Sequence, residues 1–310
     1  MTTNQHRAER SHACRIGLIQ FLFLLLLPFV FSSCCGAAIV VQDDEGNTVR
    51  LNQPAQRIIA MAPNITELLF AAGAGRLIAG AVSYSDFPED AKKIPQIGDN
   101  RDVDIERIIA MKPDLLVLSR QVTSDRQEQQ LRSLHIPLYY CEPRTMAAIP
   151  SSVKRLGQLA GSAAQADKVA QQLQQQLDAL TSRYARRPPV RMFYQVWDKP
   201  LFTLNGRHIV SDAIRICGGV NIFSGLKILA PTVSIEAVLQ EDPEAIIGTA
   251  EEHPADGGLA MWQRYPSMTA VQHKNLFLLD GNLINRAGPR MLDGATALCE
   301  KLELARQARH

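Results

Sequence analysis

The stretch from Ala163 to about Arg186 constrains the fold more than any other part of the chain. It contains no glycine or proline and is rich in Ala, Gln and Leu, which favour helices. A helix of this length spans roughly 35–40 Å, about the size of a small domain. It is therefore either a core helix or a rigid strut between two lobes. Apolar residues recur along it at steps of three and four, which gives it one apolar face: Val169, Leu173, Leu177 and Leu180.

A repeat flanks this helix and favours the strut. Residues 104–118 read DIERIIAMKPDLLVL, and residues 234–248 read SIEAVLQEDPEAIIG. Each copy has a capping residue, a glutamate in the first turn, a short amphipathic helix, and then proline and an apolar strand. The glutamates are Glu106 and Glu236. Two copies in matching order predict two similar α/β lobes, one on each side of the long helix.

The rest of the chain fits this division. Strand and helix patterns alternate in both halves, which is typical of parallel sheets. We expect a first lobe at 39–162 that opens with a hairpin at 39–52, a linking helix at 163–187, and a second lobe at 188–310. The predicted fold class is α/β, with two Rossmann-like lobes and a ligand cleft between them, the usual place for a small ligand.

Residues 1–38 read as a targeting segment rather than as part of the fold. Arg7, Arg10 and Arg15 precede the apolar run Ile16–Phe31, and small residues follow, as in a secretory signal peptide. The alternative is a membrane anchor, but the run is shorter than the ~20 residues of a spanning helix and contains a proline. A lipid anchor at Cys34 or Cys35 stays open.

Charge and cysteine content agree with export. Without residues 1–38 the chain keeps 30 basic and 30 acidic residues, so nothing indicates nucleic acid as a partner. Only Cys141, Cys217 and Cys299 then remain. Cys217 and Cys299 both lie in helical stretches that can face one core. An oxidising compartment favours a disulfide between them and a free Cys141, although three buried thiols are the alternative.

Catalytic motifs are absent from the sequence. It contains no nucleophile elbow, no phosphate-binding loop and no paired metal ligands, so we expect no enzyme, no cofactor and no metal site.

Four segments carry a resemblance to a known family. Residues 57–99 (RIIAMAPNITELLFAAGAGRLIAGAVSYSDFPEDAKKIPQIGD), 104–118, 202–223 (FTLNGRHIVSDAIRICGGVNIF) and 233–247 are similar to the periplasmic cobalamin-binding proteins of ABC importers. These belong to the helical-backbone class that also binds ferric siderophores and haem. The resemblance implies two α/β lobes on one long helix, little hinge motion, and export to the periplasm. It also implies a monomer that delivers its ligand to a membrane permease with its ATPase.

The resemblance implies site residues as well. The corrin ligand is expected to contact Tyr84, Trp197, Phe202, Asn282, Leu283, Ile284, Asn285 and Arg286. Cys217 and Cys299 match the family's disulfide, and Glu106 and Glu236 match the two glutamates that dock onto arginines of the permease. The sequence also departs from the family where Asn100, Ser119, Ala230 and the pair Leu283 and Ile284 replace aromatic residues.

These departures leave other functions open. Haem or a ferric siderophore is the alternative ligand within the same class. A chaperone for corrinoids or metals, without a transporter, is a second alternative. A hydrolase with Glu106 and Glu236 as acid and base is a remote one, because such carboxylates lie roughly 5–10 Å apart and the strut holds these two glutamates in separate lobes.

Overall fold

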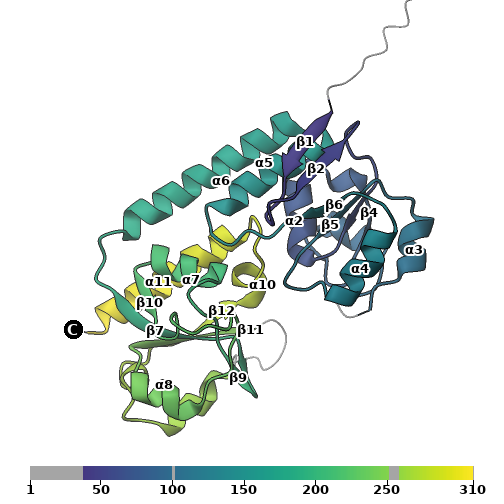
Figure 1. Ribbon diagram of the computed structural model, residues 1–310. Coiled ribbons are helices and arrows are strands. Elements are labelled where there is room, and N and C mark those ends of the chain that lie inside the picture. Colours follow the sequence, from purple (N-terminus) through teal and green to yellow (C-terminus); the bar gives the residue numbers. More distant parts are fainter. Residues whose placement is uncertain (1–37, 100–101, 251–257, 310) are drawn as a thin grey trace, which may run out of the picture. The chain divides into compact units, whose positions relative to one another are not determined.

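The computed structural model describes residues 38–99, 102–250 and 258–309. The predicted signal peptide up to residue 37, with Cys34 and Cys35, lies outside the described residues, as does Asn100. Residues 38–310 form one compact unit, which contains the two predicted α/β lobes (Figure 1). Among the helices of the described residues, none has the length and apolarity that crossing a membrane requires.

The first lobe opens with the predicted hairpin and continues into a parallel sheet of order β4-β3-β5-β6. The hairpin strands are β1 (Ile39–Gln42) and β2 (Thr48–Leu51), and the sheet strands are β3 (Ile58–Ala60), β4 (Ile78–Ala81), β5 (Leu115–Leu118) and β6 (Leu138–Tyr140). The helices are α2 (Pro63–Ala71), α3 (Ile105–Ala110), α4 (Asp125–Ser133) and α5 (Ala148–Ala160), with 3₁₀ turns at Gly75–Leu77 and Glu89–Lys93.

Helices cover both faces of this sheet, which explains why its strands are apolar throughout. Successive residues of β5 point to opposite faces. Leu115 and Val117 belong to the core that α2 and α5 cover, whereas Leu116 and Leu118 pack in the core beneath α3 and α4.

The second lobe repeats this plan with a parallel sheet of order β10-β7-β11-β12. Its strands are β7 (Val190–Gln195), β10 (Gly219–Asn221), β11 (Ala245–Ala250) and β12 (Leu276–Asp280), and β8 (Trp197–Asp198) with β9 (Leu201–Phe202) forms a separate ribbon. The helices are α7 (Ile209–Ile216), α8 (Ile235–Glu241), α9 (Thr269–Gln272), α10 (Gly281–Ile284) and α11 (Met291–Gln307), with a 3₁₀ segment at Leu259–Arg264.

The repeat flanking the long helix is present as predicted. The Asp104 carboxylate accepts a hydrogen bond of 2.8 Å from the Arg107 amide and caps α3, which leads into β5. Ser234 caps α8 in the same way, with a bond of 3.1 Å from the Ala237 amide, and α8 leads into β11. Both glutamates of the repeat lie in the first turn of these helices, where the helix dipole favours a carboxylate.

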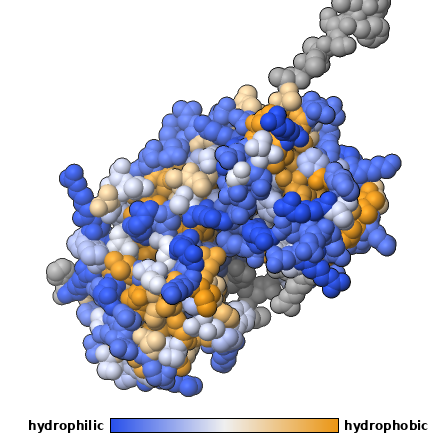
Figure 2. Space-filling view, viewed as in Figure 1, coloured by the Kyte–Doolittle hydropathy of each residue, from blue (hydrophilic) through white to orange (hydrophobic). Residues whose placement is uncertain are grey.

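The long helix α6 (Ala163–Tyr184) ends three residues before the end of the predicted linking helix at 187 and runs beside α5 (Figure 1). The two helices pack so closely that a Cβ at Gly157 would overlap the Cβ of Ala166. The buried stripe follows Ala166 and Ala170 and continues through Leu173, whereas Val169 is only partly buried. At this end of the helix the buried positions are therefore Ala166 and Ala170 rather than the predicted Val169, because α5 packs directly against the two alanines. Figure 2 shows mainly hydrophilic residues on the outer surface along this helix.

The buried stripe of α6 belongs to one continuous hydrophobic core. This core extends from hairpin residues such as Val41, through Leu173 and Leu177 of α6, to Val190 and Leu298 in the second lobe. The long helix is therefore both a strut and a core helix.

The disulfide between Cys217 and Cys299 is confirmed. It joins the end of α7 to α11 within the second lobe, with the two Cα atoms 4.6 Å apart. Cys141 is free and fully buried in the first lobe, as predicted.

For the chain from residue 38 on, we expect one titratable thiol after denaturation without reductant and three after reduction. Cys299→Ser should lower the free energy of unfolding by at most about 4–5 kcal/mol, the chain-entropy value for a closed loop of 82 residues. Cys141→Ala is the control that keeps the disulfide. Peptide mapping that finds Cys141 cross-linked would contradict the assignment.

Candidate ligand site

The loops after the carboxyl ends of the first lobe's strands carry the expected ligand residue Tyr84 and two arginines that were not predicted. Ligands of open α/β sheets bind outside these ends. The loop after β4 carries Tyr84, and the loops after β5 and β6 carry Arg120 and Arg144. Because β4 and β6 are the two edge strands, Tyr84 and Arg144 lie at opposite ends of this row of loops.

Tyr84 combines an exposed ring with a strained backbone. Its φ is +64°, in the left-handed region that costs a residue with a side chain about 1–2 kcal/mol. The residue is 71% exposed, so no core packing explains this conformation. Strain of this kind is typical of functional positions. The conformation presents a flat aromatic surface to solvent at the edge of the lobe.

Trp197 and Phe202 are brought together. They face each other as register partners in the ribbon of β8 and β9. Trp197 is 49% exposed and its indole N–H donates a hydrogen bond of 3.0 Å to the Lys199 carbonyl, which orients the ring. Phe202 is half-buried. As directly opposed residues of an antiparallel pair, the two aromatic side chains lie on the same face of the ribbon.

Arg286 of the second lobe forms ion pairs with two carboxylates of the first lobe. Its guanidinium donates to the carboxylate of Asp86 at 2.6 Å and to that of Glu67 at 3.4 Å. Arg290 also donates to Glu67, at 2.6 and 3.0 Å, and lies 3.9 Å above the ring of Phe87. The Glu67 side chain is only 2% exposed. One buried carboxylate of α2 thus holds two arginines of the second lobe.

These contacts shift the pKa values of Asp86 and Arg290. Burial alone would raise the pKa of Asp86, but the hydrogen bond and the charge of Arg286 bring it below its usual value. The hydrogen bond to Glu67 raises the pKa of Arg290. Both shifts favour the charged forms of Asp86 and Arg290. Arg286 has its charge partners, Glu67 and Asp86, within the protein.

The other expected site residues of segment 282–286 differ in burial and in hydrogen bonding. Ile284 is fully buried in the core, so its side chain does not line an open surface. The side-chain carbonyl of Asn285 accepts a hydrogen bond of 2.7 Å from the Tyr194 hydroxyl, and its side-chain amide donates one of 3.3 Å to the Thr249 hydroxyl. Asn285 is thereby fixed to the ends of β7 and β11. Asn282 and Leu283 are half-buried.

Glu106 and Glu236 occupy equivalent exposed positions in the two lobes. Within the described ranges, neither carboxylate forms a hydrogen bond or an ion pair. Both are free to contact another molecule.

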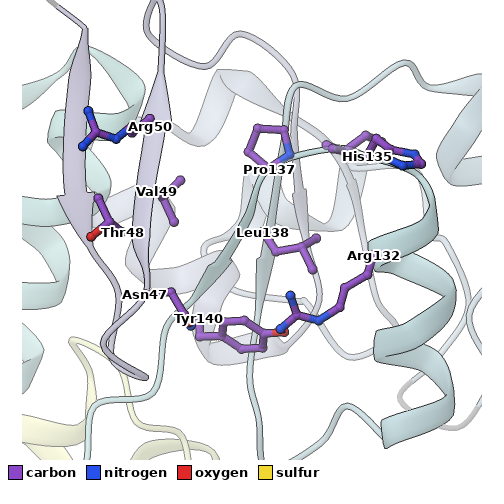
Figure 3. A pocket seen from close by; sticks show the side chains of 10 residues that line it. Asn47, Thr48, Val49, Arg50, Arg132, His135, Pro137, Leu138 and Tyr140 are labelled. Atoms are coloured by element: carbon purple, nitrogen blue, oxygen red, sulfur yellow. The ribbon is translucent and has the colours of Figure 1, made fainter.

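A hollow of about 500 Å³ lies elsewhere, between the hairpin and the edge strand β6 (Figure 3). Its lining includes Arg50, Arg132 and His135 but none of the predicted site residues. The Tyr140 hydroxyl in its wall donates to Glu128 at 2.7 Å. Because charged arginines lie in its lining, this hollow is less suited to a flat apolar ligand than the exposed aromatic rings of Tyr84 and Trp197. Among the residues that the structure describes, no group of three His, Cys, Asp or Glu side chains has the arrangement of a metal site.

The two parallel sheets, the connecting helix and the loops at the strand ends define a two-lobed substrate-binding fold. The profile of the family described as periplasmic binding protein matches residues 58–283. The chain belongs to this family of periplasmic binding proteins.

Particular relatives narrow the comparison. The vitamin B12-binding protein of Yersinia pestis (strain Pestoides F) is 35% identical over 250 residues, which cover 81% of this chain and 87% of that protein. The structure of the periplasmic vitamin B12 binding protein BtuF of Vibrio cholerae matches with a TM-score of 0.76 and 34% identity, over 82% of this chain and 98% of that one. The periplasmic haem-binding protein BhuT, in complex with two haems, shares the fold at a TM-score of 0.72 and 20% identity, over 82% and 99% of the two chains.

Sequence reasoning missed the residues that join the lobes. Glu67 was detectable in principle, because it is a lone carboxylate beside Leu68 and Leu69 in an apolar helix. Asp86 gave no such signal, and neither did Arg120, Arg144 or Arg207, which lie in loops without periodicity.

His208, next to Arg207, gives a prediction about pH. Its ring Nδ1 accepts a hydrogen bond of 3.2 Å from the Val210 amide and caps α7, and burial lowers its pKa from 6.5 to about 4. The His208 side chain is therefore protonated near pH 6.5 in the unfolded chain but only near pH 4 in the folded protein. As the pH is lowered from 6.5 toward 4, the free energy of unfolding should decrease. At pH 4.5 it should be lower than at pH 7 by on the order of 2 kcal/mol.

Urea unfolding at pH 7 and pH 4.5 tests this effect. His208→Asn, which can still cap the helix, should flatten that part of the pH profile. His135→Asn, at an exposed histidine, is the matched control and should leave the profile unchanged. Equal acid sensitivity of the parent and His208→Asn would show that other groups cause it.

Proposed function

We propose that this chain captures cobalamin or a related corrinoid in the periplasm and delivers it to the permease of an ABC importer. The observation that carries the proposal is the similarity to vitamin B12-binding proteins, at 34–35% identity over four fifths of the chain. The haem-binding protein at 20% identity shares only the fold, so haem is an alternative ligand. A ferric siderophore is a further alternative.

The exposed aromatic residues support a flat ligand. A corrin ring is large and planar, and aromatic faces supply much of the burial that it needs. In the proposal Tyr84 packs on the ring from the first lobe, while Trp197 and Phe202 form a wall on the second. Leu283 and Asn282 complete the lining, and Arg286 supplies hydrogen-bond donors at the Tyr84 end. The protein acts as a binder with no resident cofactor and no catalytic step.

The cleft of this proposal is largely preformed. The shared core along α6 and the contacts of Glu67 with Arg286 and Arg290 restrain the two lobes. A preformed cleft loses less conformational entropy when the ligand binds.

Glu106 and Glu236 are the proposed docking points for the permease. Their exposure and matching positions suit a monomer that lies across a two-fold transporter, with one glutamate contacting each half. The same separation into two lobes argues against an acid and base pair. Complementary charge would set orientation and association rate more than affinity.

Ligand binding is tested by the absorbance spectrum of the purified protein after incubation with cobalamin and, separately, with haem. We expect corrin bands to stay with the protein. Tyr84→Ala and Trp197→Ala should each weaken binding by about 1–3 kcal/mol in calorimetry. Because both residues are exposed, the melting temperature should hardly change.

Leu304→Ala, at an exposed apolar residue of α11, is the control for loss of surface area. Unchanged cobalamin affinity in both aromatic variants would remove Tyr84 and Trp197 from the site. Retention of haem bands alone would favour the alternative ligand.

Docking is tested by the double change Glu106→Arg with Glu236→Arg. Ligand affinity should stay unchanged while complex formation with the permease and uptake are lost, and each single change should give an intermediate defect that is larger at low salt. Asp167→Arg with Glu300→Arg makes the same charge change at other exposed positions. Uptake by the Glu106 and Glu236 double variant at the parental rate would refute the docking role.

A further inference from the structure

A second pocket combines loops of both lobes. It has a volume of about 490 Å³ and lies at the carboxyl ends of β5 and β6, the opposite end of the strand row from Tyr84. The first lobe contributes four lining residues and the second lobe two: Arg120, Gln121, Glu142 and Arg144, with Arg207 and Leu229.

The three arginines differ in how their charges are balanced. Arg120 forms ion pairs with Asp125, at 3.0 Å, and with Glu128. Arg144 pairs with Glu45 at 2.6 Å. Arg207 donates only to the main-chain carbonyl of Lys227, and no carboxylate of the described residues pairs with it. Within the described part of the chain, the pocket therefore contains one exposed guanidinium without a carboxylate partner.

The backbone that carries Arg207 is rigid. Its amide donates a hydrogen bond of 2.9 Å to the side-chain carbonyl of Asn205, which is fully buried and donates in turn to the Leu226 carbonyl at 2.8 Å. At Gly206 a Cβ would come within 2.9 Å of the Ser224 carbonyl oxygen, so this turn packs tightly. The backbone of Arg207 is thus fixed at the pocket, and its guanidinium is oriented by the hydrogen bond to the Lys227 carbonyl. Such preorganisation favours binding.

The acidic residue of the pocket is held apart from this arginine. Glu142 is buried, and its Oε2 accepts hydrogen bonds from the Ser119 hydroxyl at 2.6 Å and from the Gln121 amide at 3.3 Å. Burial raises the pKa of this carboxyl, which reduces its repulsion of a nearby anion. Arg144 lies two residues further along the same loop, and its pairing with Glu45 is solvent-exposed and weak.

We infer that this pocket is an oxyanion subsite, in which Arg207, assisted by Arg144, binds an ionised phosphodiester or carboxylate arm of the ligand. A planar guanidinium binds such oxygens through paired, charge-assisted hydrogen bonds. The inference rests on the proposed function, and it specifies the ligand as a macrocycle with an anionic side arm. The ring lies toward Tyr84, and the arm reaches the opposite end of the row of strand-end loops.

Three corrinoids separate the sources of the oxyanion. Cobalamin carries one phosphodiester, cobyrinic acid carries carboxylates around the ring, and cobinamide carries neither. We expect Arg207→Gln to weaken the binding of cobalamin, cobyrinic acid or both by about 10–100-fold, the range for a hydrogen bond to a charged group. Cobinamide binding should stay unchanged. A loss with cobalamin alone assigns the phosphodiester, and a loss with cobyrinic acid alone assigns a carboxylate.

The control variants make the outcome specific. Arg207→Lys keeps the charge and should retain part of the affinity, whereas Arg144→Gln should give a smaller loss because Arg144 is already paired. Arg186→Gln, at an exposed arginine two residues after the end of α6, makes the same charge change elsewhere and should have no effect.

Calorimetry with the three corrinoids decides between the outcomes. Unchanged affinity of Arg207→Gln for all three ligands would overturn the inference and leave the proposed function intact. An equal loss that includes cobinamide would also overturn it, because it would indicate a general disturbance of the cleft. If the parent protein binds no corrinoid, the proposed function fails first.

Discussion

The burial of one face of α6 by both lobes is the constraint on which the rest of the structure depends. Leu173 and Leu177 belong to the same core as strand residues of both sheets, such as Leu115 and Val190. Part of the apolar surface of each lobe is therefore buried together with this helix. Close packing between α5 and α6, with Gly157 against Ala166, fixes the helix to the first lobe, and its contacts with α7 and α11 join it to the second.

Electrostatics adds a second restraint at the interface. Glu67 is almost fully buried, and its carboxylate forms ion pairs with Arg286 and Arg290. Removing one partner from a buried ion pair usually costs about 3–5 kcal/mol because the other charge stays uncompensated. A rotation of the lobes that separated these groups would meet this cost in addition to the loss of apolar contact along α6. The arrangement fits a binding protein with a preformed cleft.

The features that sequence reasoning predicted are those with local signals. The caps at Asp104 and Ser234 and the apolar strands after each repeat depend on residues only a few positions apart. The two-residue strands β8 and β9 have no detectable period, and their ribbon was missed. The ion pair of Glu67 with Arg290 joins residues 223 positions apart, and the pocket at Arg207 combines loops of both lobes. Such contacts exist only after the chain has folded.

The burial of Cys141 affects how the chain acquires its cross-link. Three cysteines from residue 38 on permit three pairings, and only the one between Cys217 and Cys299 is native. Burial raises the pKa of the Cys141 thiol, so little of it is the thiolate that attacks disulfides. Once the first lobe has folded, its cysteine is withdrawn from exchange. The native pairing of Cys217 with Cys299 is then favoured over the two that involve Cys141.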